Sequence, residues 1–188
     1  MLPARRKFFT RDGLRVASRA GLPNIRFPSN FMAMSNSTPA LRALHFIRAN
    51  HTSDTFLTAL HFLFHAFFTP PHRDVSKVDS VADILRDCPA GFDGSGREGR
   101  GKLFTEGQVG EIMEAAGGAD MKGSVKRETD EVLAKGAFGA PWLCVRDGQG
   151  REETFFGSDR FVYVYEHLGL PVRGVEIQGA GSAGGAKL

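Results

Sequence analysis

The sequence has little cysteine and no long uninterrupted apolar run. Its 188 residues include two cysteines, Cys88 and Cys144, which are too few and too far apart for a C-x-x-C redox pair, a zinc cluster or a disulfide framework. A reducing compartment is therefore expected. The longest apolar stretch, from Phe56 to Phe68, is interrupted by threonine and histidine and falls short of the roughly eighteen residues of a membrane helix. No membrane partner is predicted.

Neither sign of charge dominates the chain. It carries 24 Lys and Arg against 21 Asp and Glu, and the resulting net charge of +3 does not indicate a nucleic-acid partner. The positive charge is concentrated near the start, where an anionic partner would be met and where a mitochondrial transit peptide has to be considered. The residues that carry it are Arg5, Arg6, Lys7, Arg11, Arg15 and Arg19. With 41% apolar residues, the chain can bury a core of ordinary size.

The first 135 residues are predicted to be mostly helical, because apolar residues recur there at helical spacing between polar caps. The Phe-rich segment has so many apolar residues that little of it is expected to face water. The expected helices cover residues 4–19, 40–49, 56–68, 78–85, 107–116 and 121–135. The expected caps are Thr38, Ser53 or Asp54, Ser76 or Asp79, and Thr105, the last within a capping box with Gln108. Gly and charge dominate Pro89 to Lys102, which predicts a flexible surface insertion with almost nothing to bury.

The pattern changes after residue 136. Trp142 to Arg146 and Glu153 to Phe156 are β-rich and flank the turn Asp147-Gly148-Gln149-Gly150, so an antiparallel hairpin is predicted. Ser158 or Asp159 is expected to cap a closing helix that runs through Leu168. Residues 171–188 decay into Gly, Ala and Ser, which predicts a disordered tail.

Two motifs near the hairpin resemble a known family. The run G-A-F-G-A-P-W-L-C-V begins at Gly136, and F-F-G-S-D-R ends at Arg160. Their order and spacing resemble the kappa-class glutathione transferases and the related bacterial chromene-carboxylate isomerases, which are thioredoxin-like proteins with a helical insertion. Upstream, the resemblance continues through Leu2-Pro3, Phe8-Phe9, Asp12 and Phe27-Pro28 to Phe31, so it covers nearly the whole chain.

The resemblance implies an α/β fold of a particular kind. It predicts an incomplete thioredoxin-like fold in which a helical segment and insertion domain occupy residues 1–135 and residues 136–170 form the C-terminal half of the thioredoxin-like unit. That half retains a β-hairpin and a helix. The first β-α-β unit of the family precedes its L-P segment and has no match here, so the chain is expected to be truncated at its N-terminus.

Glutathione is the ligand that the resemblance implies. In the family the bond before the matching proline is cis, which would leave the N-H and C=O of Ala140, beside Pro141, free to pair with the cysteinyl part of glutathione. Ser158 and Asp159 would lie at a helix start that holds the γ-glutamyl carboxylate, while Asp159 takes the ammonium group. The alternatives are an ordinary loop proline at Pro141 and a simple N-cap at Ser158-Asp159.

No catalytic residue is assigned. The family's Ser that stabilises the glutathione thiolate lies in the unmatched segment, and nothing here replaces it by motif, while the family's Lys after L-P aligns with Arg5. The family activity is conjugation of glutathione to an electrophilic small molecule, or glutathione-dependent peroxide reduction. We expect this activity to be impaired. The alternative is a non-catalytic thioredoxin-like remnant, or an interaction subunit whose open hairpin edge pairs with another chain, such as a homodimer partner.

Three remaining features carry weaker expectations. His61 and His65 share one helix face and could supply half of a metal site, but no second pair of ligands is visible and no metal is predicted. Cys144 is expected in the core and Cys88 at the surface, neither of them reactive. The final Ala186-Lys187-Leu188 resembles the S-K-L peroxisomal signal, so peroxisome is the first predicted location and mitochondrion the second.

Overall fold

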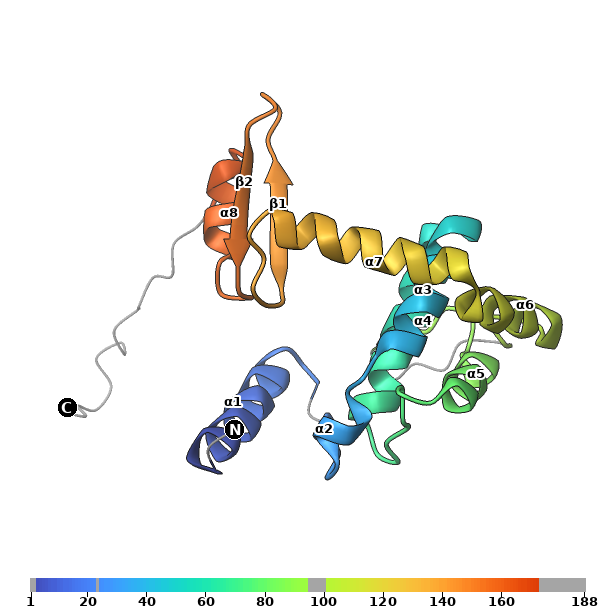
Figure 1. The fold of residues 1–188 in the computed structure, drawn as a ribbon. Helices are drawn as coiled ribbons and strands as arrows, with labels where there is room; N and C mark the ends of the chain where they lie inside the picture. The colour runs from blue at the N-terminus through green and yellow to red at the C-terminus, as the bar shows by residue number, and fades with distance from the viewer. Residues whose placement is uncertain (1–2, 23, 95–100, 173–188) are drawn as a thin grey trace. The chain divides into compact units, whose positions relative to one another are not determined.

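The computed structural model describes residues 3–22, 24–94 and 101–172, with the side chains of residues 3–7 and Phe9 outside that description. It mixes helices with a small antiparallel sheet, as the α/β prediction required (Figure 1). The chain separates into two compact units, one up to Asp130 and the other from Glu131 onward. This division falls within helix α7 (Ala119–Ala134), and the predicted domain boundary after residue 135 lies just beyond the end of that helix. Each unit is described by itself.

The first unit is built from helices. They are α1 (Pro3–Arg19), α2 (Phe31–Met34), α3 (Thr38–Asn50), α4 (Ser53–Phe68), α5 (Val78–Asp87), α6 (Glu106–Gly117) and the larger part of α7 (Ala119–Ala134). All six predicted helices are present, and α2 is a short helix outside the predicted ranges. None of the helices in the described part of the chain is long and apolar enough to cross a membrane.

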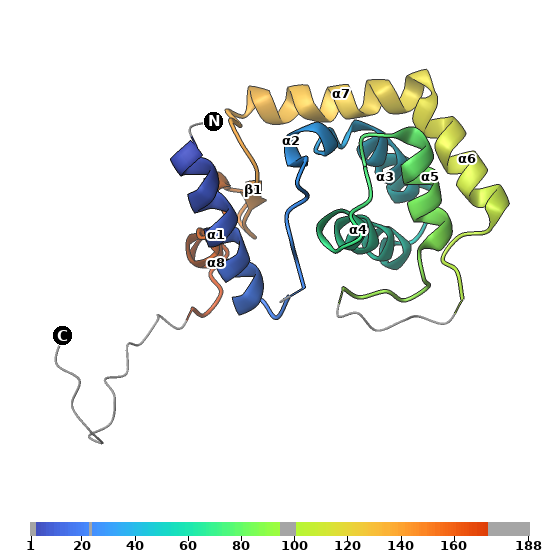
Figure 2. The ribbon, with the colours of Figure 1, turned by 90° about the horizontal axis from the view of Figure 1, so that it is seen from below.

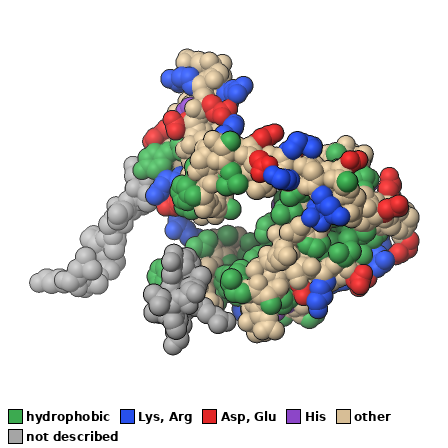
Figure 3. All heavy atoms as spheres, viewed as in Figure 1, with side chains coloured by type: hydrophobic (Ala, Val, Ile, Leu, Met, Phe, Trp, Pro, Cys, Tyr) green, Lys and Arg blue, Asp and Glu red, His purple; other side chains and the backbone are tan. Residues whose placement is uncertain are grey.

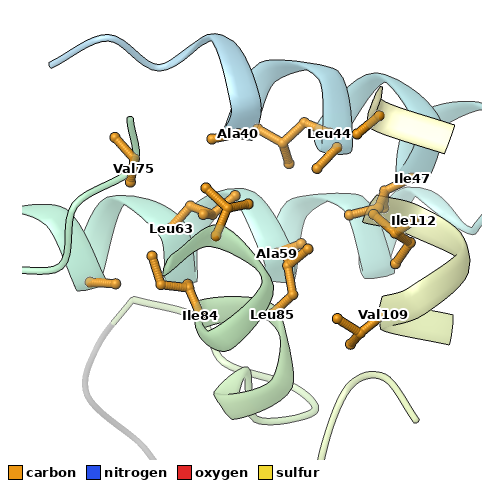
Figure 4. Close-up of a cluster of buried hydrophobic side chains, with 14 of the residues drawn as sticks. Ala40, Leu44, Ile47, Ala59, Leu63, Val75, Ile84, Leu85, Val109 and Ile112 are labelled. Atoms are coloured by element: carbon orange, nitrogen blue, oxygen red, sulfur yellow. The ribbon is translucent and has the colours of Figure 1, made fainter. Parts of the chain in front are cut away.

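Helices α3, α4, α5 and α6 surround one hydrophobic core (Figures 2 and 4). Ile47, Ile84, Leu85 and Ile112 are among its fully buried side chains. In α3 the buried stripe is Ala40, Ala43, Leu44 and Ile47, whereas Leu41 is 43% exposed. Helix α7 buries no side chain and meets α3 through polar contacts, in which Glu128 pairs with Arg48 and with His45.

The helix caps show where local sequence decides and where it does not. Thr105 and Gln108 form the predicted capping box at the start of α6. At α4 the prediction of Ser53 or Asp54 is wrong, because the hydroxyl of Thr52 accepts the hydrogen bond from the amide of Thr55. Helices α3 and α5 begin after Ser37 and Lys77 with no side-chain cap, so the caps predicted there are wrong as well.

The insertion at residues 89–102 is more ordered at its ends than its composition predicts. Pro89 and Lys102 form an antiparallel bridge, and the amide of Leu103 donates to the carbonyl of Cys88 at 2.8 Å. Phe92 is buried against the rings of Phe62 and His65, so the expectation that this segment has almost nothing to bury is wrong. Residues 95–100 lie outside the described part of the chain.

The second unit contains the predicted hairpin and the closing helix. Strand β1 (Trp142–Arg146) pairs with β2 (Glu152–Phe156) in a register that places Trp142 opposite Phe156. Helix α8 (Phe161–His167) packs on one face, where His167 meets the ring of Phe155 and Val164 is buried. Among the described residues no third strand pairs with either edge. Most of the tail predicted over residues 171–188, with Ala186-Lys187-Leu188, lies outside the described residues.

Candidate functional site

The peptide bond between Ala140 and Pro141 is cis, as the resemblance implied. The two residues come directly before β1, and both are exposed. Among the residues that the structure describes, none forms a hydrogen bond with the amide or carbonyl of Ala140. Both backbone groups are therefore available to a ligand that approaches in an extended conformation.

Ser158 and Asp159 lie in a turn at the end of β2. Gly157 opens this turn with a φ of 105°, a conformation that favours glycine, and its carbonyl accepts a hydrogen bond from the amide of Arg160. Helix α8 begins only at Phe161 after Arg160, with no side-chain cap, so the prediction that Ser158 or Asp159 caps it is wrong. Asp159 is instead 71% exposed and pairs with its neighbour Arg160.

One backbone hydrogen bond brings these two segments together. The amide of Gly157 donates to the carbonyl of Pro141 at 3.1 Å, one step beyond the Trp142–Phe156 pair that ends the ladder. Ala140, Pro141, Ser158 and Asp159 are therefore at the same end of the hairpin, opposite the Asp147-Gly150 turn. The arrangement can offer a ligand two free backbone groups and one carboxylate at neighbouring positions.

An aromatic cluster that the sequence analysis did not single out lies beside these residues. The ring of Phe138 is 4.5 Å from that of Phe156 and 5.4 Å from that of Trp142, measured between centroids. Phe138 is 74% exposed, and Figure 3 shows hydrophobic side chains at the surface of this unit. The Trp142 Nε1 is buried and donates no hydrogen bond to any described residue. Strand alternation places Trp142 and Phe156 on the face away from α8, which is the signal that could have revealed the cluster.

Ion pairs strengthen the other parts of the hairpin. Glu152 accepts from Lys135 at 2.7 Å and from Arg146 at 3.0 Å. These bonds lower the pKa of Glu152, and the same contact with Glu152 raises the pKa of Lys135. In the turn, the guanidinium of Arg151 donates to Asp147 and lowers the pKa of that carboxyl group. The ion pairs of Arg146 with Glu152 and of Arg151 with Asp147 thus lie toward the turn end of the hairpin, away from Ala140 and Pro141.

Both cysteine predictions are wrong. Cys88 is fully buried, and burial raises the pKa of its thiol to about 12. Cys144 is exposed because it lies, with Trp142 and Arg146, on the strand face that α8 does not cover. His61 and His65 lie one turn apart on α4, and the described residues contain no group of three or more side chains that could hold a metal ion.

Comparison with known proteins gives two relatives, and no family model matches the chain. The chain is 28% identical to glutathione S-transferase kappa 2 of Caenorhabditis elegans over 176 residues, which are 92% of this chain and 70% of that protein. It is 32% identical to glutathione S-transferase kappa 1 of the same organism over 82 residues, which are 37% of this chain and 36% of that protein. The first of these matches extends through both units.

Proposed function

We propose that this chain, which is related to the kappa-class glutathione transferases, binds glutathione at the end of its hairpin where Ala140, Pro141, Ser158 and Asp159 meet. The observation that carries the proposal is the hydrogen bond from the Gly157 amide to the Pro141 carbonyl. This bond keeps the free backbone groups of Ala140 and the carboxylate of Asp159 at the same end of the hairpin. The unit would contribute to a thioredoxin-like fold of the kind found in that family.

Each part of glutathione has a partner of suitable chemistry. The free amide and carbonyl of Ala140 would pair with the backbone of the cysteinyl residue in β fashion. The carboxylate of Asp159 would take the γ-glutamyl ammonium group in place of Arg160, and Ser158 would donate its hydroxyl to the γ-glutamyl carboxylate. The backbone amides of the turn would support that carboxylate, since α8 is too short and begins too late to do so.

We propose glutathione binding for this chain, and the reaction to be tested is the one expected of a kappa-type transferase. A kappa-type transferase conjugates the glutathione thiolate to an electrophilic small molecule or uses it to reduce a peroxide. Activation of the sulfur requires a donor or a positive charge beside it, and the four residues named here contact the backbone and the γ-glutamyl end. We therefore expect glutathione binding with little conjugation by this chain alone.

Calorimetry with glutathione tests the binding site. We expect saturable binding to the full chain, weakened about tenfold by Asp159→Asn because a charge-assisted hydrogen bond is lost. Glu153→Gln is the matched control, since Glu153 is an exposed acid on the neighbouring strand and lies outside the site. Absence of binding up to millimolar glutathione, or equal affinity of the Asp159 and Glu153 variants, would refute the proposal.

Activity measurements test the restriction to binding. A chromogenic aryl halide and a hydroperoxide are supplied with glutathione, and the rates with and without the chain are compared. We expect little acceleration above the uncatalysed rate. A rate that saturates with glutathione and falls in Asp159→Asn would instead show that the chain also activates the thiol.

The aromatic cluster favours a second candidate function, that of an interaction subunit. Phe138, Trp142 and Phe156 form an apolar patch beside a two-stranded sheet whose edges pair with no other described strand. Such a surface invites pairing with a second copy of the chain. Light scattering after size exclusion distinguishes this function, because a monomer at every concentration tested would argue against it.

A further inference from the structure

Three arginines line one face of α1. Arg11, Arg15 and Arg19 follow one another at intervals of four residues, and all three are exposed. At 3.6 residues per turn, such a series stays within an arc of about 80° around the helix. Arg11 and Arg19 form no ion pair with another described residue, and Arg15 lies 4.0 Å from Asp12, the single acid of the helix. The described part of the chain therefore leaves the positive charge of this face almost uncompensated.

The opposite face of α1 is turned toward the rest of the first unit. A Cβ on Gly13 would lie 2.8 Å from the ring of Phe27, so the helix approaches that ring at the position where it has no side chain. Phe27 in turn packs edge-on against Phe31 and Phe68. Gly13 lies about 160° around the helix from the middle of the arginine face. The contact with Phe27 therefore directs the arginine face outward.

Two large apolar side chains project beside the arginines. Phe8 is 59% exposed and lies within the same arc, and Val16 is 60% exposed just beyond its edge. Exposed apolar side chains next to a row of cations are typical of helices that lie on a membrane surface, where the apolar groups enter the boundary between headgroups and acyl chains. Guanidinium groups bind phosphate oxygens well, and an anionic membrane presents many phosphates in one plane.

We propose that α1 docks on an anionic phospholipid surface through this face. The three arginines would bind lipid phosphates, and Phe8 and Val16 would enter the headgroup layer. The exposed apolar groups favour a lipid surface over an acidic protein, because a layer of phosphates attracts clustered cations without a matching shape. Such a contact needs no spanning helix. It departs from the expectation that the chain has no membrane partner, which depended on the absence of a long apolar run.

Cosedimentation with lipid vesicles tests the proposal on the full chain. We expect binding to vesicles of phosphatidylcholine and phosphatidylglycerol in equal parts, and little binding to phosphatidylcholine alone. Arg11→Gln, Arg15→Gln and Arg19→Gln together should weaken binding to the anionic vesicles at least about tenfold, because each cation near the charged surface adds to the attraction. Salt at about 0.5 M should release the protein, since it shortens the Debye length to a few ångströms.

Two matched controls separate this face from other exposed cations and apolar groups. Lys122→Gln, Lys126→Gln and Arg127→Gln together remove three exposed cations from α7, where acidic residues lie among them, and this triple variant should bind as the unmodified chain does. Val16→Ser should weaken binding several-fold. Val78→Ser removes a valine of similar exposure, 56%, from α5 and should leave binding unchanged.

The outcomes that would overturn the proposal are distinct. They are no binding to either kind of vesicle, equal binding to both, and equal losses in the two triple variants. Binding to polyglutamate in preference to the anionic vesicles would assign the face to an acidic protein and would overturn it as well. Should the arginine variant lose its helical circular dichroism, the salt dependence and the comparison of Val16→Ser with Val78→Ser decide the question.

This inference does not rest on the proposed glutathione site. Saturating glutathione and the Asp159→Asn variant should both leave vesicle binding unchanged. The failure of one proposal is therefore separable from the failure of the other.

Discussion

The amide of Gly157 donates to the carbonyl of Pro141, and this bond joins the turn that carries Asp159 to the cis-proline segment that carries Ala140. The two segments are separated by the whole hairpin in sequence. Their meeting depends on the strand register, in which Trp142 lies opposite Phe156. Changes that alter the turn at Gly157 should therefore affect both the hairpin and the proposed glutathione site.

Replacement of Gly157 is the first prediction. A Cβ at this position would lie 2.6 Å from Oδ1 of Asp159 at a φ of 105°, so Gly157→Ala should displace the Asp159 carboxylate and strain the backbone. We expect the second unit to lose about 1–2 kcal/mol of unfolding free energy, together with weaker glutathione binding. Urea unfolding followed by the fluorescence of Trp142, the single tryptophan, measures the loss.

Gly148 supplies the control for that experiment. It lies in the hairpin turn, and a Cβ built there meets no atom within 4 Å. Gly148→Ala should leave the urea midpoint nearly unchanged. Equal midpoints for the Gly157 and Gly148 variants would contradict the account of the turn.

The cysteines should differ sharply in reactivity. Burial raises the pKa of the Cys88 thiol to about 12, whereas Cys144 is exposed on the strand face away from α8. Because the thiolate is the reactive form, iodoacetamide at about pH 8 should modify Cys144 in the folded protein and leave Cys88 intact. Peptide mass spectrometry after timed quenching gives both rates, and urea should make them similar. Comparable modification of both thiols without denaturant would show that Cys88 is not buried in solution.

Acid should weaken the hairpin through Asp147. Hydrogen bonds from Arg151 and from the amides of the turn lower the folded-state pKa of Asp147 below its ordinary value of about 4. A depressed carboxyl pKa contributes stability above the unfolded-state pKa, and this stability is lost as the pH falls through the folded-state pKa. The urea midpoint reported by Trp142 should fall below about pH 4, and Asp147→Asn should flatten that decline.

Glu152 also contributes to the acid sensitivity of the hairpin, so its effect has to be measured separately from that of Asp147. Lys135 and Arg146 hold the pKa of its carboxyl below the ordinary value. Glu152→Gln should remove its own share of the acid sensitivity, and the double variant should remove more than either single one. An acid profile that is the same in all four proteins would mean that neither carboxylate is linked to folding.

Truncation in the helical core should destabilise the first unit. Ile112 is fully buried in the cluster of α3 to α6, so Ile112→Ala should cost about 2–5 kcal/mol in lost burial and cavity formation. Leu41→Ala, on the exposed side of α3, should change stability by less than about 0.5 kcal/mol. Unfolding followed by circular dichroism measures both, and equal effects would be inconsistent with the packing described here.

Local signals in the sequence predicted most of the elements. The hairpin is determined by β-rich segments around Asp147-Gly148-Gln149-Gly150, and α6 by the reciprocal bonds of Thr105 and Gln108, all of which act over a few residues. The cis bond at Pro141 was implied by the resemblance. The hairpin register accounts in physical terms for the hydrogen bond from the Gly157 amide to the Pro141 carbonyl, which places Ala140 and Asp159 at the same end of the hairpin.

Features that depend on tertiary contacts were not predictable in the same way. Cys88 is buried beside the Pro89–Lys102 bridge, where its carbonyl accepts from the amide of Leu103, and Phe92 is buried against the rings of Phe62 and His65. Neither contact has a short-range signature in the sequence. The predicted start of α8 is wrong because Ser158 and Asp159 lie in the turn that begins at Gly157, and the helix starts only after Arg160.

The bridge between Pro89 and Lys102 also has a practical consequence for engineering. Because the two arms of the loop are joined at their base, a foreign peptide spliced between Gly94 and Gly101 would leave the packing of Cys88 and Phe104 intact. Loop-closure entropy rises slowly with length, by about 0.6 kcal/mol for each doubling. This loop is therefore a place at which we expect the chain to accept an epitope or a fluorescent reporter.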